Sequence, residues 1–563
     1  MANPISRTTF PKSKESDILL TDDFLHYLQE MHDRFSDRIR EIRRVRQKTL
    51  EEVHRNGVDS LNQPEVITST SQWSVDPVPE DLKRPGIEIS GPSSLAHMFI
   101  NAVNPGPEGE RAVGYLDDDE DSGGHTLQDT LNSAQNRLQA VEGTLRYEDP
   151  SRGRIYEVEP GELPFLMHRE RGLHLDEPSV TIDGTPVSAT ILSTCLTIFH
   201  AGRAQIAKNK GVYFYLPKLE SSEEVAIYKD FFDLSKKYLN LPKSAVIKGI
   251  ILVESLPAVY RMEEMLRTLG TYGAGLNAAR WDLKASILEY IMTDPKSVWP
   301  DRFDVDIKTT AFISNIFRRL VAICLKHGAV AIGGMATALP SRDEDINRLA
   351  SASIRNDKEW EARQGFLRGW TAHIYHMKTA SDPFVERWNT GWAPPKSMKD
   401  PSNYPVVIEV PNGQITKEGT RRNVRTVVEY VEGWLSGRGA KGIDSMEGRE
   451  GKHPALMEDL ATARISVGQV SQRIIHQALA SDTGETHSLA MIKSITDSEI
   501  QDILRIRSLD LNRSDFDLSK TTYESSRKIT LRWIKNYTQL NFKSLGSYTR
   551  EDLSNIASSP DAF

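Results

Sequence analysis

The stretches Ile251-Leu252-Val253-Glu254-Ser255 and Gly275-Leu276-Asn277-Ala278-Ala279-Arg280-Trp281-Asp282 decide the fold class of this chain. Each contains a short apolar run, and a carboxylate follows each run, Glu254 in the first stretch and Asp282 in the second. Short apolar runs of this kind are typical of buried parallel strands. In a parallel α/β barrel the functional groups lie at the carboxyl ends of the strands, which is where we expect both carboxylates.

Glu254 and Asp282 are therefore candidate ligands of a divalent metal ion. They lie 28 residues apart, about one strand–helix–strand step, so we expect them on neighbouring strands. Two carboxylates that leave room for water and substrate suit Mg²⁺ better than a softer metal. The alternative is that each acid caps the helix that follows its strand.

Apolar, strand-like runs alternate with helical segments from about residue 86 to residue 380. The eight predicted strands are residues 112–116, 164–168, 212–216, 247–253, 274–277, 305–310, 329–332 and 370–373. Eight such units predict an α/β fold of the (β/α)₈ TIM barrel type. A doubly wound open sheet is the alternative. The glycine-rich dinucleotide fingerprint and the P-loop are both missing from the sequence.

Helical segments precede and follow the predicted barrel. Apolar residues at three- and four-residue spacing predict a helix over residues 19–54, and its half from Arg38 to Lys48 is basic. We expect that half to be a solvated helix face rather than a nucleic-acid contact. Further helical blocks run over residues 420–435 and from residue 456 onward. The predicted organisation is an N-terminal helical segment with a connector (1–85), a TIM barrel (86–380) and a C-terminal helical domain (381–563).

Composition narrows the class of protein. The chain has 563 residues, enough for a barrel with additions, and a net charge of −8, which gives no drive toward nucleic acid or acidic membranes. Cys195 and Cys324 lie far apart, which excludes a disulfide framework and fits a reduced compartment. No apolar run is long enough to span a membrane, and neither a signal-peptide core nor a Ser-Lys-Leu type ending is present. We expect a cytoplasmic protein.

Seven motifs in a consistent order resemble the malate synthase family, in its shorter A-type form. They are Met167-His168-Arg169-Glu170-Arg171-Gly172-Leu173-His174-Leu175, Leu456-Met457-Glu458-Asp459 with Ala461-Thr462-Ala463, and residues 87–92, 117–121, 215–220, 275–282 and 333–336. The resemblance extends over about residues 19–480. It implies a condensation of acetyl-CoA, or another acyl-CoA, with glyoxylate or a related 2-oxo acid, followed by hydrolysis of the thioester.

The resemblance also implies roles for the central residues. The family's catalytic base, which deprotonates the acetyl methyl group, matches Asp459, and the arginine beside the developing enolate matches Arg169. Mg²⁺ held by Glu254 and Asp282 would chelate the oxo acid and polarise its aldehyde. Beyond the coenzyme A ester no organic cofactor is implied. The expected partners are small-molecule substrates rather than nucleic acid or a membrane, and the oligomeric state stays open.

Further residues are expected around this centre. Backbone N–H groups near Trp281 and Asp282 would bind the substrate carboxylate. The other candidate contacts are Gly275 and Arg280 for the substrate, Glu120 and Asp121 as supports for Arg169 and the metal, and Pro340, Arg342 and Lys358 for the phosphates of coenzyme A. Simpler explanations exist: Asp459 opens a helix and would serve as its cap, and the acidic run 117–121 would ordinarily form a solvated loop.

Several positions depart from the family pattern. They are Leu173, Ala279, Leu283, Ala338, Leu367-Arg368 and Arg464, and residues 444–453 form an insertion before Asp459. All four central groups are nevertheless present, which favours an active enzyme or a repurposed one. A repurposed enzyme would use a different acid or acyl-CoA, or would run aldol, lyase or hydrolase chemistry. A non-catalytic paralogue is the remaining alternative.

Overall fold

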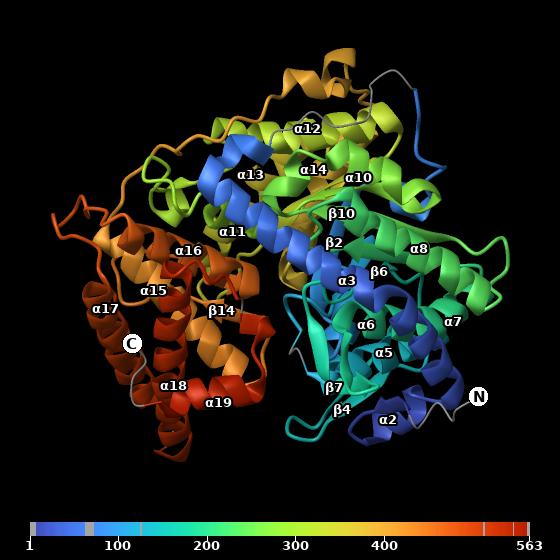
Figure 1. The fold of residues 1–563 in the computed structure, drawn as a ribbon, viewed down its shortest axis with the longest axis horizontal. Helices are drawn as coiled ribbons and strands as arrows, with labels where there is room; N and C mark the ends of the chain where they lie inside the picture. The colour runs from blue at the N-terminus through green and yellow to red at the C-terminus, as the bar shows by residue number, and fades with distance from the viewer. Residues whose placement is uncertain (1–6, 62–71, 124–125, 511–512, 544, 560–563) are drawn as a thin grey trace.

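The computed structural model describes residues 7–61, 72–123, 126–510, 513–543 and 545–559. Eight parallel strands form a closed barrel at its centre (Figure 1). In chain order the strands are β2 (Gly86–Pro92), β3 (Gly114–Asp118), β6 (Phe165–Arg169), β9 (Val212–Leu216), β10 (Ile247–Val253), β11 (Gly273–Ala278), β12 (Val330–Ala336) and β13 (Arg368–Thr371). The last strand, β13, pairs with the first, β2, which closes the ring. The predicted TIM barrel is confirmed, and the open-sheet alternative is wrong.

The predicted set of eight strands contains one strand that does not exist and lacks one that does, so the total is still eight. Residues 305–310 were expected to form a strand but lie in a turn after a short 3₁₀ helix, Arg302–Asp304. The carboxylate of Asp306 accepts the backbone N–H of Lys308, and its carbonyl accepts that of Thr310. This local turn chemistry competes with a strand. The strand that was missed is β2, whose apolar run is interrupted by Glu88.

Helices surround the barrel and connect its strands. They are α4 (Ala96–Val103), α5 (Leu127–Glu142), α6 (Ala189–Thr197), α7 (Arg203–Ala207), α8 (Ser222–Tyr238), α9 (Leu256–Val259), α10 (Met262–Leu269), α11 (Arg280–Tyr290), α12 (Ala311–His327), α13 (Glu344–Gln364) and α14 (Met377–Asn389). Small antiparallel pairings join β1 (Thr8–Thr9) to β7 (Asp176–Ile182), β7 to β8 (Thr185–Ser188), and β4 (Arg146–Asp149) to β5 (Arg154–Glu157). The ring of helices around the barrel strands is the usual layering of this fold.

A polar layer lies inside the barrel, below the mouth. Glu88 is fully buried and forms an ion pair of 2.5 Å with Arg368. Its second oxygen accepts the Tyr215 hydroxyl at 2.7 Å and the Trp370 indole N–H at 3.2 Å. The unusual Arg368 of the last strand is therefore satisfied by a barrel-interior partner. It supports the strands beneath the mouth and does not reach the mouth itself.

The N-terminal helices are α2 (Lys14–Leu19) and α3 (Asp22–Asn56), and α3 confirms the predicted long helix. The expectation of a solvated basic face holds for Arg40, Arg44 and Lys48, which are exposed, but it is wrong for Arg43 and Arg46. Arg43 donates to the carbonyls of Leu173 and Leu175, and Arg46 forms a bidentate pair with Glu224 and donates to the Lys218 carbonyl at 2.6 Å. These arginines fasten α3 to two loops at the barrel mouth.

Helices α15 (Lys417–Leu435), α16 (Leu460–Ile475), α17 (Leu489–Asp510), α18 (Arg513–Thr538) and α19 (Arg550–Ser558) gather on one side of the barrel (Figure 1). They enclose a second hydrophobic core, whereas the apolar face of α3 belongs to the barrel core. We propose on this basis that residues 7–61 and 72–85 complete the barrel domain and that the C-terminal domain begins after α14, which packs on β2 and β13, rather than at the expected residue 381. No helix among the described residues is long and apolar enough to cross a membrane.

The buried Glu88–Arg368 pair generates a prediction about stability. Glu88→Gln would leave the Arg368 charge without its counter-ion, so we expect a loss of about 3–5 kcal/mol in the free energy of unfolding of the barrel. The matched control is Glu80→Gln, whose exposed pair with Lys83 is worth less than about 1 kcal/mol. Denaturant unfolding of the two variants checks this, and equal effects would contradict it.

Candidate functional site

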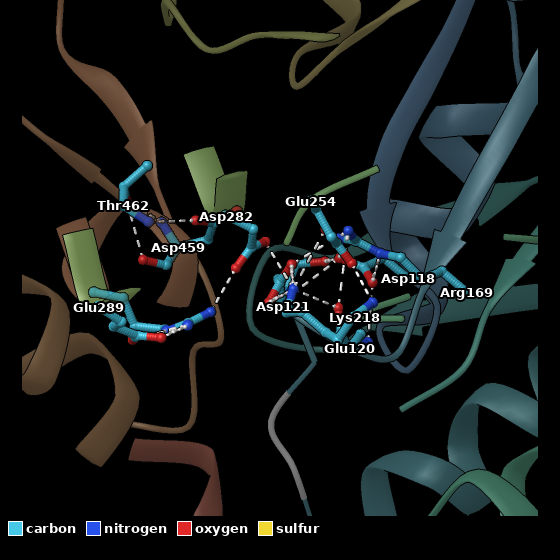
Figure 2. Close-up of polar contacts among 12 residues, drawn as sticks. Asp118, Glu120, Asp121, Arg169, Lys218, Glu254, Asp282, Glu289, Asp459 and Thr462 are labelled. Atoms are coloured by element: carbon cyan, nitrogen blue, oxygen red, sulfur yellow. Dashed lines mark hydrogen bonds and ion pairs between the residues drawn. The ribbon is translucent and has the colours of Figure 1, made fainter. Parts of the chain in front are cut away.

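Four carboxylates converge on one ammonium group at the carboxyl ends of the barrel strands (Figure 2). The Nζ of Lys218 lies 3.0 Å from Glu120, 3.1 Å from Asp121, 2.7 Å from Asp282 and 3.6 Å from Glu254. These residues come from the segments that follow β3, β9, β10 and β11. Burial alone would lower the pKa of Lys218, but the surrounding carboxylates raise that pKa well above its usual value. Lys218 is therefore a cation in this site.

Glu254 is buried directly after β10. Its Oε1 accepts the backbone N–H of Lys218 at 2.5 Å, whereas its Oε2 has no hydrogen-bond partner in the described part of the chain. Burial raises the pKa of Glu254 to about 8; the Lys218 charge opposes that rise, and the charges of Asp282 and Asp121 add to it. A buried carboxylate oxygen without a hydrogen bond has a strong preference for a cation.

The donor set at this point fits Mg²⁺. Strands β10 and β11 are paired, so Glu254 and Asp282 follow neighbouring strands as the sequence predicted. Both candidate ligands are carboxylates, and the Glu254 Oε2 has an unused acceptor site. Within the described residues no group of three or more protein ligands surrounds a metal position. Two carboxylates are nevertheless enough for Mg²⁺, which usually keeps waters and binds substrate oxygens in its other positions.

Arg169 ends strand β6 and lies beside this cluster. Its guanidinium forms a bidentate pair with Asp118, at 2.7 and 2.6 Å, and lies 3.2 Å from Asp121. The Trp370 ring is beneath it, 5.8 Å from the guanidinium carbon. The simpler explanation of residues 117–121, a solvated loop, is wrong because all five acids are buried. Each of them faces an arginine or Lys218, which offsets the cost of burial.

Asp459 is the N-cap residue of α16. Its Oδ1 accepts the Thr462 backbone N–H at 3.2 Å, and the Thr462 hydroxyl accepts the Asp459 N–H in return. Capping occupies one oxygen of the carboxylate and is compatible with a second role for the other. Burial raises the pKa of Asp459 to about 7, and the charges of Asp121 and Asp282 add to this rise. A base with a pKa near 7 is suited to proton abstraction at neutral pH.

Contacts of the residues directly before Asp459 carry it to the barrel mouth. The residues before it form β15 (Leu456–Glu458), which pairs with β14 (Lys441–Ile443). The Met457 N–H donates to the Thr337 carbonyl at 2.7 Å, and Glu458 forms a bidentate pair with Arg302. In Figure 2 Asp459 and Arg169 lie on opposite sides of the Lys218 cluster. A substrate between them would contact the cluster as well.

Helix α11 begins at the mouth with Arg280, and no described side chain caps its first turn. The backbone N–H groups near Trp281 and Asp282 therefore remain suited to an anion. Two expectations are wrong. Arg280 points away into a buried pair with Asp357 and Glu361. Gly275 lies inside β11, where an added Cβ would be 2.1 Å from the Val330 carbonyl oxygen, so its role is close packing of strands.

The three residues expected to contact coenzyme A phosphates do not lie together. Pro340 and the exposed Arg342 are in the loop after β12. Lys452, in the insertion 444–453, forms ion pairs with Asp343 and Asp345 of this segment. Lys358 is fully buried and donates to the Gly334 carbonyl and to Glu361. The expectation for Lys358 is wrong because its ammonium cannot reach a phosphate at the surface.

A cavity of about 530 Å³ adjoins the cluster. The barrel, the C-terminal domain and, through Arg46, helix α3 enclose this cavity. Its wall includes Arg46, Lys218, Glu254, His174, Glu289, Arg464 and Phe542. Arg464 donates to Asp282 at 2.8 Å and to both oxygens of Glu289 at 2.9 Å. Arg464, one of the departures from the family pattern, thus binds Oδ1 of Asp282, while Lys218 binds its Oδ2.

Sequence reasoning missed Lys218, Asp118 and Arg464 as members of the site. Lys218 follows β9 by two residues, at the same barrel edge as Glu254, so its strand-end position was a usable signal. Asp118 was set aside with the acidic run. Arg464 lies five residues after Asp459, more than one helical turn, and was recognised as a departure without a partner.

Comparison with known proteins agrees with this geometry. Residues 165–400 match a family model described as malate synthase, TIM barrel domain, and residues 414–539 match one described as malate synthase, C-terminal. The chain is 31% identical to malate synthase A of Escherichia coli (strain K12), over 88% of this chain and 89% of that protein. It is 32% identical to malate synthase of Streptomyces clavuligerus, over 87% and 89% of the two chains. It is 30% identical to glyoxysomal malate synthase of Gossypium hirsutum, over 81% and 78%.

The contact of Arg464 with Asp282 and Glu289 generates a second prediction. Arg464→Met would leave two carboxylates of α11 without this cation, so we expect a loss of about 3 kcal/mol in the free energy of unfolding. Arg438→Met, which removes an exposed arginine paired with Glu432, serves as the control and should cost less than about 1 kcal/mol. Thermal and denaturant unfolding measure both, and a neutral Arg464→Met would show that the contact does not stabilise the fold.

Proposed function

The chain belongs to the malate synthase family, and we propose that it condenses acetyl-CoA, or another acyl-CoA, with glyoxylate or a related 2-oxo acid and then hydrolyses the thioester. The observation that carries the proposal is the arrangement at the barrel mouth. Asp459, Arg169, Glu254 and Asp282 come from four separate segments, and Asp459 and Arg169 lie on opposite sides of the Lys218 cluster that contains Glu254 and Asp282 (Figure 2). Such a convergence of a base, a cation and two carboxylates is what enolate chemistry requires.

Asp459 is the proposed catalytic base. It would take a proton from the methyl carbon next to the thioester carbonyl, using the carboxylate oxygen that does not cap α16. Its raised pKa makes it a better proton acceptor than an ordinary aspartate. Contacts of Met457 and Glu458 with the barrel keep it at the mouth, so the proton is taken at a defined position.

Arg169 would stabilise the negative charge that develops on the thioester oxygen. Its bidentate pair with Asp118 fixes the plane of the guanidinium before substrate binds, which lowers the reorganisation needed during reaction. The first-turn N–H groups of α11 would bind the carboxylate of the 2-oxo acid. Glu254 and Asp282 would hold Mg²⁺, whose contribution is to polarise the aldehyde of the acid.

The identity of the acid and of the acyl group is the finer part of the proposal. Ala279 and Leu283, on either side of Asp282, are buried, and Arg464 contacts Asp282 directly. These differences motivate the second candidate, the same reaction type with another 2-oxo acid or acyl-CoA. Both cysteines are buried free thiols, which supports a reducing compartment, and we propose small molecules rather than nucleic acid as partners.

Release of free coenzyme A tests the reaction directly. Protein given acetyl-CoA, glyoxylate and Mg²⁺ should release thiol and form a carbon–carbon-linked product that mass spectrometry identifies. A panel of 2-oxo acids and acyl-CoA esters then ranks substrates by kcat/KM. No thiol release with any member of the panel would refute the proposal and favour a non-catalytic paralogue.

The proposed base generates a mutational prediction. Asp459→Asn should lower kcat by about 10²–10⁴-fold because an amide cannot accept the methyl proton. Asparagine is also a good N-cap, so α16 and the fold should be retained, which circular dichroism and thermal unfolding check. Asp400→Asn makes the same change at the exposed cap of a short 3₁₀ helix and should leave kcat unchanged. Equal activity of the two variants would exclude Asp459 as the base.

The raised pKa of Asp459 generates a prediction about pH. The base must be ionised to act, so kcat/KM should fall about tenfold for each pH unit below an apparent pKa near 7. An ordinary aspartate would place this acid limb near pH 4. Asp121→Asn removes a negative neighbour and should move the limb to lower pH. A limb near pH 4 in the unmodified protein, or one that does not respond to this substitution, would contradict the assignment.

A further inference from the structure

The position of the Lys218 ammonium has a consequence for metal binding. Nζ lies 2.7 Å from Asp282 and 3.6 Å from Glu254, the two proposed metal ligands, and near Glu120 and Asp121 as well. A cation that must contact the same two carboxylates would occupy nearly the same point. Two cations this close repel one another strongly in a buried site. Lys218 and Mg²⁺ therefore compete for one place.

The backbone of Lys218 is fixed. Its φ is +53°, a left-handed conformation that a lysine seldom adopts without support. Its N–H donates to Glu254 at 2.5 Å, and its carbonyl accepts the Arg46 guanidinium of α3 at 2.6 Å. Any exchange must therefore come from rotation of the four-carbon side chain, which carries only the ammonium with it.

Space for that rotation exists beside the cluster. Lys218 lines the cavity of about 530 Å³, whose wall also contains the acids Glu220 and Glu289. Arg464, the other cation on Asp282, is held by two hydrogen bonds of 2.9 Å to Glu289. Both cations on Asp282 line the cavity, but Arg464 is also tied to Glu289, outside the cluster, whereas the ion pairs of the Lys218 ammonium are all with the four carboxylates of the cluster.

We propose that Lys218 is an internal counter-ion that occupies the metal position in the metal-free protein and turns into the adjoining cavity when Mg²⁺ binds. The inference rests on the proposed function for the identity of the metal. It assigns Lys218 a positioning role: the ammonium keeps four mutually repelling carboxylates together until the divalent ion replaces it. The same role makes the resting affinity for Mg²⁺ weaker than the carboxylates alone would give.

Binding of Mg²⁺ alone, measured by titration calorimetry without acyl-CoA or oxo acid, tests the competition. Lys218→Met removes the competing charge at similar length, so Mg²⁺ should bind about tenfold or more tightly than to the unmodified protein. Lys218→Arg keeps the charge and should bind no more tightly than the unmodified protein. Unchanged or weaker binding to Lys218→Met would overturn the proposal.

A second measurement needs no variant and decides the question if Lys218→Met does not fold. Reductive methylation of lysines, followed by peptide mass spectrometry, reports how accessible each ammonium is. Labelling of Lys218 should rise severalfold when Mg²⁺ is added. Lys441 is an internal control, because it is also buried between two carboxylates, Glu429 and Glu432, and these belong to α15 rather than to the Lys218 cluster. Its labelling should not change.

The outcomes separate this inference from the proposed reaction. If Lys218 labelling is unchanged or falls with Mg²⁺, while the protein still releases coenzyme A, the exchange is refuted and the reaction stands. If Lys218 responds to Mg²⁺ but no substrate pair releases coenzyme A, the exchange stands and the reaction is refuted. A parallel rise in Lys441 labelling would indicate general loosening and would also overturn the exchange.

Discussion

Mutual repulsion among buried carboxylates is the constraint on which the mouth of this barrel depends. Glu120, Asp121, Glu254 and Asp282 cannot approach one another at low solvent exposure unless positive charge is placed among them. The structure supplies that charge from three parts of the chain. Lys218 and Arg169 come from the barrel and Arg464 comes from the C-terminal domain, while Arg46 of the N-terminal helix holds the backbone that presents Lys218. The site is therefore a product of the whole chain.

The sequence allowed the barrel and its central pair of acids to be predicted because both depend on local signals. Short apolar runs mark the strands, and Glu254 and Asp282 follow two of them directly. The failures have physical causes. Glu88 interrupts the apolar run of β2, so the strand was missed. A buried strand can hold this charge because Arg368, 280 residues later in the chain, neutralises it. Residues 305–310 were apolar enough for a strand, but the Asp306 side chain stabilises a turn there.

The site residues followed the same rule. Pairings between distant segments, such as Arg280 with Glu361 or Lys358 with the Gly334 carbonyl, cannot be read from either segment alone. For the same reason the basic half of α3 was read as a solvated face throughout, although Arg43 and Arg46 reach loops that follow β6 and β9. Asp459 is the opposite case, because its two explanations are compatible: the capping role is confirmed, and the catalytic role stays a prediction. It caps its helix with one oxygen, and burial, together with the nearby charges of Asp121 and Asp282, raises its pKa.

The proposed base and the proposed metal ligands belong to different hydrophobic cores. Asp459 opens a helix of the C-terminal core, whereas Glu254 and Asp282 follow strands of the barrel. The two are joined through the packing of α16 on α11 and through a short backbone pairing between residues 337–339 and 455–457. A partial opening that frees this junction would disconnect proton transfer from carbonyl activation while every strand of the barrel stayed folded. Catalytic competence then depends on the stability of this junction, and it can be lost at temperatures where the bulk of the protein is still native.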